Sequence, residues 1–253
     1  MTPSDNELWP ETPDRFEPAR PSVRKEMLPK RALASFAFLA GCLPRRRSGR
    51  RALGVLTILM AFAGTALLTY PLVTDLWAKS RQNDLRKQFG SQQAIEQYRR
   101  KQIPVGGALT RIVIKKMGAC ATCRVNVIVV EGISGNALRA GAGHYPQTVL
   151  PGELGNVAIA GHRTGFGEPF RHIDKLRPGD IITLETPVGE YIYEVVKPPV
   201  DGHGNPWITG PDDLSVLAPT IDATLTLTTC DPPHTSKNRL IVRAKLIQSK
   251  LVA

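Results

Sequence analysis

Three residues in the second half of the chain have side chains that together could carry out acyl transfer. Cys230 follows an alternating run of β-branched and apolar residues, TLTLTT, and Arg239 directly precedes the apolar run LIV. His162 ends another short apolar run, NVAIAG. A thiolate can attack a carbonyl carbon, an imidazole can move the proton, and a guanidinium can stabilise charge on the acyl oxygen. These residue types predict chemistry through a thioester.

The elements that would position these residues are short strands. From Pro104 onward, β-branched runs alternate with Gly, Pro and Asp, which is typical of a mainly β domain. Many short strands separated by turn signals predict a closed barrel or a sandwich, with short helices at 135–140 and 169–176. The expected strands are 109–115, 125–130, 157–160, 181–186, 190–196, 224–229 and 240–246. Each of the three candidate residues then lies at the edge of a strand.

An uncharged stretch between Arg51 and Asp75 is long enough to cross a bilayer, which takes about 20 apolar residues as a helix. The basic cluster RRRSGRR precedes it, so the positive-inside rule predicts a cytoplasmic N-terminus and an extracellular β domain. The polar segment after the stretch predicts a helical stalk with a break near Gly90. The chain thus divides into a disordered tail, a transmembrane anchor, a stalk or linker and a β domain, at 1–51, 52–76, 77–103 and 104–253.

The net charge of +11 is concentrated outside the β domain. Residues 102–253 carry fifteen Lys and Arg against thirteen Asp and Glu. A nucleic-acid-binding protein would be expected to have a basic face on its folded domain. The distribution therefore argues against nucleic acid as a partner and for contact with anionic headgroups at a membrane.

Three further cysteines leave alternatives open. Cys42 ends the motif LAGC, which resembles a lipoprotein cleavage box, but the Arg cluster behind it would then have to be exported. We favour an interfacial or re-entrant cytoplasmic segment there. Cys120 and Cys123 form a CxxC pair that could be a disulfide, free thiols, or two zinc ligands completed by His144 or His172. Because a second CxxC or an HxxxH partner is missing, we favour the disulfide or free thiols.

The segments GHYPQTVLPGELGNVAIAGHR and TLTTCDPPHTSKNRLIV resemble the sortases, cysteine transpeptidases of the Gram-positive cell surface. The TLxTC motif at 226–230, the Arg downstream of it and the GHR segment at 161–163 stand in the family's order. The form GHYP…NVAIAGHR resembles class E, the housekeeping type of high-GC actinobacteria. The resemblance covers about 104–248 and implies a sortase-like closed β-barrel of eight strands. The anchor and stalk also fit the family's layout.

The resemblance implies that Cys230 is the nucleophile, His162 the catalytic histidine and Arg239 the essential arginine. It also implies cleavage of an LPxTG-like sorting signal between Thr and Gly, with LAxTG preferred in class E. The expected partners are secreted proteins with C-terminal sorting signals and an amine of a cell-wall peptidoglycan precursor. Tyr145 occupies the place that is implicated in the class E preference.

Three residues beside these motifs are further candidates for substrate contact: Thr229 next to the nucleophile, His144 before the tyrosine, and His234 in the loop DPPHTSKN. His234 is also a rival base. We expect no cofactor and no metal, because the sequence lacks a convincing carboxylate array for calcium. The alternative function is a membrane-tethered surface module that is non-catalytic or binds zinc. The stretch ACATCRVN at 119–126 appears inserted relative to the family, which leaves open whether it gates the groove.

Overall fold

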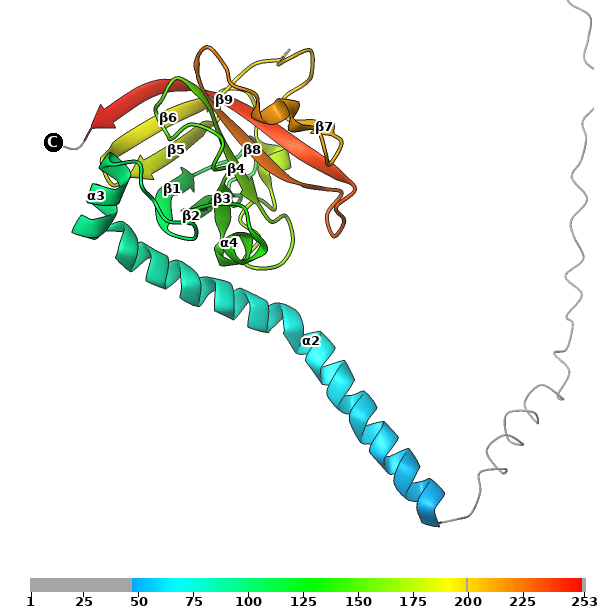
Figure 1. Ribbon diagram of the computed structural model, residues 1–253. Coiled ribbons are helices and arrows are strands. Elements are labelled where there is room, and N and C mark those ends of the chain that lie inside the picture. Colours follow the sequence, from blue (N-terminus) through cyan, green and yellow to red (C-terminus); the bar gives the residue numbers. More distant parts are fainter. Residues whose placement is uncertain (1–46, 199, 252–253) are drawn as a thin grey trace, which may run out of the picture. The chain divides into compact units, whose positions relative to one another are not determined.

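The computed structural model describes residues 47–198 and 200–251 (Figure 1). The chain divides into two compact units, one up to Ala61 and one from Phe62 onward. The LAGC motif and most of the expected tail lie outside the described residues. Arg47 already belongs to helix α2 (Arg47–Phe89), so the helix begins five residues before the expected anchor.

Helix α2 contains a stretch that is long and apolar enough to cross a membrane. Its large apolar side chains between Leu53 and Leu76 are exposed. The helix ends at Phe89, and α3 (Gln92–Arg99) follows after the predicted break at Gly90. Ser91 caps α3 by accepting a hydrogen bond from the backbone N–H of Ala94 at 3.2 Å.

Eight strands form the predicted closed barrel in the order β6-β5-β1-β2-β3-β4-β8-β9, and pairing between β6 and β9 closes it (Figure 1). The eight are β1 (Ala108–Ile114), β2 (Val125–Glu131), β3 (Ala142–His144), β4 (Gly155–Gly161), β5 (Ile181–Thr186), β6 (Gly189–Val195), β8 (Ala223–Asp231) and β9 (Asn238–Leu251). A ninth strand, β7 (Trp207–Thr209), pairs with the first part of β9. The strand order matters for function because β4, β8 and β9 are consecutive neighbours.

The helical elements differ in part from the expectation. Helix α4 (Gly135–Ala140) forms where it was predicted. The prediction of a helix over 169–176 is wrong, because only the short 3-10 turn η1 (Ile173–Lys175) forms there. Phe170, Ile173 and Leu176 are fully buried, so their three-residue spacing reflects contact with the core rather than a helix. A second 3-10 turn, η2 (Leu214–Leu217), precedes β8.

The second half of α2 packs on the barrel. Leu85 is buried in a small apolar cluster with Ile128, Val130, Ala137 and Ala140, which belong to β2 and α4. The side chain of Gln82 donates to the carbonyl oxygens of Ile128 and Ala140 at 3.0 and 2.7 Å, and accepts from the Ile128 N–H at 2.7 Å. The segment expected as a stalk or linker is therefore, at this point, an integral part of the folded unit.

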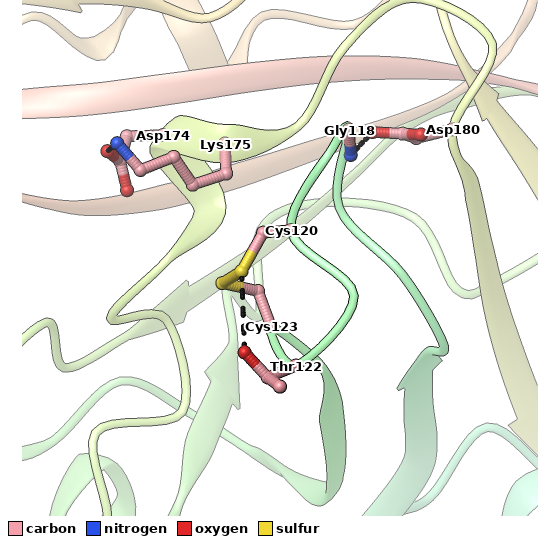
Figure 2. The surroundings of a disulfide bond; sticks show 7 residues. All are labelled: Gly118, Cys120, Thr122, Cys123, Asp174, Lys175 and Asp180. Carbon is pink, nitrogen blue, oxygen red and sulfur yellow. Dashed lines mark hydrogen bonds and ion pairs between the residues drawn. A yellow bond between two sulfur atoms is a disulfide. The ribbon is translucent and has the colours of Figure 1, made fainter.

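The connection between β1 and β2 carries a disulfide between Cys120 and Cys123, with a Cα–Cα distance of 5.3 Å (Figure 2). Because the two sulfurs are bonded to each other, neither is available to bind zinc. The Gly118 N–H donates to the Asp180 carboxylate at 2.6 Å. Cys123 lies in the main core, and Gly118, just before the stretch 119–126, contacts the connection between β4 and β5 through Asp180 and the Lys175 carbonyl.

Candidate active site

His162 and Cys230 lie at the ends of two neighbouring parallel strands. The register of β4 and β8 pairs Ala160 with Thr228, so two residues further on His162 and Cys230 occupy equivalent positions. Neighbouring strands are about 4.8 Å apart, which brings the two residues side by side. The buried Thr229 hydroxyl donates to the Gly161 carbonyl at 2.7 Å and holds the two strands together directly before the pair.

Arg239 reaches the thiol from the other side. It is the cross-strand partner of Cys230 in the antiparallel pairing of β8 with β9. Its Nη1 lies 3.9 Å from the sulfur and also donates to the carbonyl oxygens of Ser236 and Asn238, both at 3.1 Å. The Cys230 thiol is free and partly exposed. The fold thus brings all three predicted catalytic residues to one end of three adjacent strands.

The His162 ring is partly buried and lies with its centroid 5.4 Å from that of Phe166. Burial lowers the pKa of His162 below its ordinary value, and the positive charge of Arg139 on α4 lowers it further. The neutral imidazole is therefore favoured at neutral pH, which is the form that accepts a proton. Gly161, just before the histidine, has no room for a side chain, because a Cβ there would lie 2.6 Å from the Phe170 ring.

Tyr145 directly follows β3 and is partly exposed. Its hydroxyl lies 3.2 Å from Thr228 Oγ1, two residues before the nucleophile on β8. The structure therefore connects this candidate to the strand that carries Cys230.

The other candidates for substrate contact lie differently. His144 is only 1% exposed; its Nδ1 lies 2.8 Å from the Glu131 carboxylate and its Nε2 is 3.0 Å from Thr148 Oγ1. A ring with both nitrogens engaged inside the protein has no surface to offer a peptide, so a direct contact by His144 is not supported. The Thr229 hydroxyl is likewise buried in its bond to the Gly161 carbonyl. His234 is exposed in the turn between β8 and β9.

Sequence reasoning missed Arg163, which follows His162 just after the end of β4, and Asp231, which follows Cys230 as the last residue of β8. The Arg163 side chain is 8% exposed, and its Nη1 donates both to the Asp231 carboxylate and to the Cys230 carbonyl oxygen, the latter at 3.3 Å. Its Nη2 lies 3.6 Å from the Asp174 carboxylate of η1. The sequence signal that could have revealed them is that the residues directly after His162 and Cys230 carry opposite charges.

No group of three or more His, Cys, Asp or Glu side chains suited to a metal ion occurs within 47–198 and 200–251.

Comparison with known proteins shows the family. Residues 113–247 match the family model of the sortase domain. The chain is 37% identical over 143 residues to sortase SrtE1 of Streptomyces coelicolor, which covers 50% of this chain and 38% of that protein. It is 34% identical over 134 residues to SrtE2 of the same organism, covering 50% and 53%. The chain thus spans about half, or less, of the length of these curated relatives.

A solved structure of sortase D5 from Clostridium perfringens superimposes with a TM-score of 0.54 at 31% identity, covering 67% of this chain and 98% of that one. SrtF from Corynebacterium diphtheriae does so with a TM-score of 0.53 at 28% identity, covering 60% and 90%. The two curated relatives carry the class E designation, in agreement with the GHYP…NVAIAGHR motif. With a matching family model over more than half of its residues, the chain belongs to the sortase family of cysteine transpeptidases.

Proposed function

We propose that the protein is a membrane-anchored transpeptidase that cleaves an LAxTG- or LPxTG-like sorting signal between Thr and Gly. It would join the released acyl group to a cell-wall amine. One observation carries the proposal: Cys230 on β8 and Arg239 on β9 are cross-strand partners, and His162 follows the end of the neighbouring strand β4 at the position equivalent to Cys230. A thiol nucleophile, a proton carrier and a fixed positive charge are the parts that acyl transfer through a thioester needs.

In the acylation step, His162 accepts the thiol proton and the sulfur of Cys230 attacks the carbonyl carbon of the substrate threonine. A C–S bond forms and the carbonyl π electrons move onto the oxygen. Arg239, whose Nη1 lies 3.9 Å from the sulfur, is placed to stabilise that negative charge. Collapse of the intermediate breaks the Thr–Gly C–N bond, and His162 returns its proton to the departing amine.

In the second step, an acceptor amine attacks the thioester carbon. The amine loses a proton to His162 as the new C–N bond forms, the C–S bond breaks, and the thiol of Cys230 recovers a proton. The net reaction exchanges one amide for another and needs neither an oxidant nor a reductant. The lowered pKa of His162 supports this cycle, because the imidazole has to accept a proton in each half.

Substrate recognition is assigned to the surface beside the catalytic end of β8. Tyr145 is partly exposed and bonded to that strand, and His234 is exposed in the turn that follows Cys230. The proposed partners are secreted proteins with C-terminal sorting signals and the amine of a peptidoglycan precursor.

The proposed location is the cell membrane, with the anchor in α2, the N-terminus in the cytoplasm and the barrel outside. The basic cluster at 45–51, ahead of the apolar part of the helix, supports this orientation. The disulfide between Cys120 and Cys123 supports it independently, since disulfides persist mainly in oxidising compartments.

The test uses the full chain in detergent with fluorogenic LAxTG and LPxTG peptides, beside the variant Cys230→Ala. The proposal expects cleavage that disappears in the variant, and the ratio of the two rates measures the class E preference. If neither peptide is cleaved and Cys230 does not react with a thiol probe, the protein is a membrane-tethered module without catalysis.

A further inference from the structure

The hydrogen-bonded ladder between β4 and β8 ends before it reaches the catalytic residues. Its last pair is Ala160 with Thr228. Beyond that pair, the Thr229 hydroxyl binds the Gly161 carbonyl, and Arg163 binds the end of β8. The spacing of His162 and Cys230 therefore depends on these side-chain contacts as well as on the pairing of the two strands.

Arg163 makes the outermost of these contacts, and its guanidinium has three acceptors. Nη1 donates to the Asp231 carboxylate and to the backbone carbonyl of Cys230, and Nη2 lies 3.6 Å from the Asp174 carboxylate. A charge that is 92% shielded from solvent is stable only when it is paired in this way. The buried guanidinium of Arg163 thus connects the residue that directly follows His162 with the backbone carbonyl of Cys230.

Asp174 is itself held in place. It lies in η1 between Ile173, which is buried, and Lys175, which is exposed and whose ammonium is 3.0 Å from the Asp174 carboxylate. The connection that carries the disulfide lies against this turn, because a Cβ on Gly118 would be only 2.7 Å from the Lys175 carbonyl oxygen. The Arg163 contacts therefore extend from the catalytic pair to η1 and to the connection between β1 and β2 that lies against it.

We infer that Arg163 is a positioning residue, which sets the distance and orientation of His162 relative to Cys230 through its bonds to Asp231 and to the Cys230 carbonyl. The inference rests on the proposed function and adds a residue that touches neither the substrate nor the reacting atoms. Nucleophile and base must be aligned closely, and a misplacement of about 1 Å can cost a factor of about 100 in rate.

The test compares Arg163→Ala with Arg163→Lys and with a matched control, Arg243→Ala. Arg243 is 6% exposed, lies 3.4 Å from the Asp201 carboxylate and, like Arg163, has an Nε without a hydrogen-bond partner within the described part of the chain. It is on β9, opposite Thr226 and away from Cys230. The control therefore removes an equally buried arginine without disturbing the catalytic pair.

Three quantities are measured on the full chain in detergent: kcat and KM with the cleaved peptide, the rate constant for alkylation of Cys230 by iodoacetamide, and Tm. For Arg163→Ala we expect kcat and the alkylation rate to fall at least about tenfold while KM stays within about twofold, since alignment is lost and binding is kept. Arg243→Ala should lower Tm similarly and keep kcat within about threefold. Arg163→Lys should recover only part of kcat, because the lysine ammonium keeps the positive charge but cannot reproduce the planar, forked donor geometry of the guanidinium.

If kcat falls in both arginine variants in proportion to Tm, Arg163 only stabilises the fold and the inference is wrong. Should Arg163→Ala fail to fold, Asp231→Asn replaces it, with the same expectation of a reduced kcat at a nearly unchanged KM. If the proposed function is wrong, the result is different, because the wild-type chain then cleaves neither peptide. The alkylation rates of Cys230 in the wild-type chain and in the variants can still be compared in that case. An alkylation rate that Arg163→Ala leaves unchanged overturns the positioning role in either case.

Discussion

The contact between helix α2 and the barrel is testable through Gln82. Its side-chain amide makes three hydrogen bonds, two to Ile128 and one to Ala140, with donor–acceptor distances of 2.7 to 3.0 Å. The change Gln82→Ala leaves one N–H and two carbonyl groups without these partners. If the helix is only a linker, this loss should not matter to the stability of the barrel.

The expected magnitude follows from the number of bonds. One hydrogen bond contributes about 1 kcal/mol net, so three contribute about 3 kcal/mol when water cannot replace them. Gln82 is partly exposed, and water can reach some of the freed groups, which lowers the expected loss to about 2–3 kcal/mol. For a domain of this size, 1 kcal/mol shifts Tm by about 2–4 °C, so we expect a decrease of about 4–12 °C.

The assay is thermal unfolding of the full chain in detergent, followed by near-UV circular dichroism of the barrel. The matched control is Gln88→Ala, since Gln88 is exposed on the same helix and its substitution changes helix propensity equally. A Tm of Gln82→Ala equal to that of the control would refute the reasoning. The hydrogen bonds of Gln82 would then contribute nothing measurable to the stability of the folded unit.

Three other perturbations have defined outcomes. Arg139→Gln removes a positive charge that lowers the pKa of His162, so that pKa should rise while burial keeps it below its ordinary value; an NMR titration of the ring that shows no upward shift would contradict this. Tyr145→Phe loses the hydroxyl contact to β8 and should change the ratio of LAxTG to LPxTG cleavage by up to about fivefold, the equivalent of one hydrogen bond, with little change in Tm. Replacing Cys120 and Cys123 by Ser opens a four-residue loop and should cost about 2 kcal/mol, measured by urea unfolding; a reductant should have the same effect on the wild-type chain and none on the variant.

Sequence reasoning predicted most of the barrel because its strands carry β-branched runs. The observed β5 has the bounds expected from its sequence, and the alternating run before Cys230 forms β8. The two strands that were missed have three residues each. β3 is the sequence AGH, which has no β-branched residue, and β7 lies in a segment rich in Gly and Pro. Pairing with neighbours far along the chain, rather than local propensity, makes these segments strands.

The residue types of the candidate site could be predicted from the sequence, but the contacts that position them could not. Cys230, His162 and Arg239 follow from their chemistry and their motifs, whereas the alignment of His162 with Cys230 depends on a register between strands that are distant in sequence. The role of Arg163 depends on the same register. The burial of His144 could not be predicted, because it follows from the pairing of β3 with β2, and β3 itself was not predicted.

Strand β9 pairs with β6, β7 and β8, and it determines the order in which the protein can assemble. A ribosome delivers the chain from its N-terminus, so β1 to β8 emerge while two strand edges, on β6 and β8, still lack a partner. Unpaired edges of this kind invite aggregation, and contacts between remote strands form slowly. Arg239 arrives on the same strand that closes the barrel. The thiol of Cys230 therefore gains its cross-strand partner only when those edges are covered, so that completion of the barrel and assembly of the candidate site coincide.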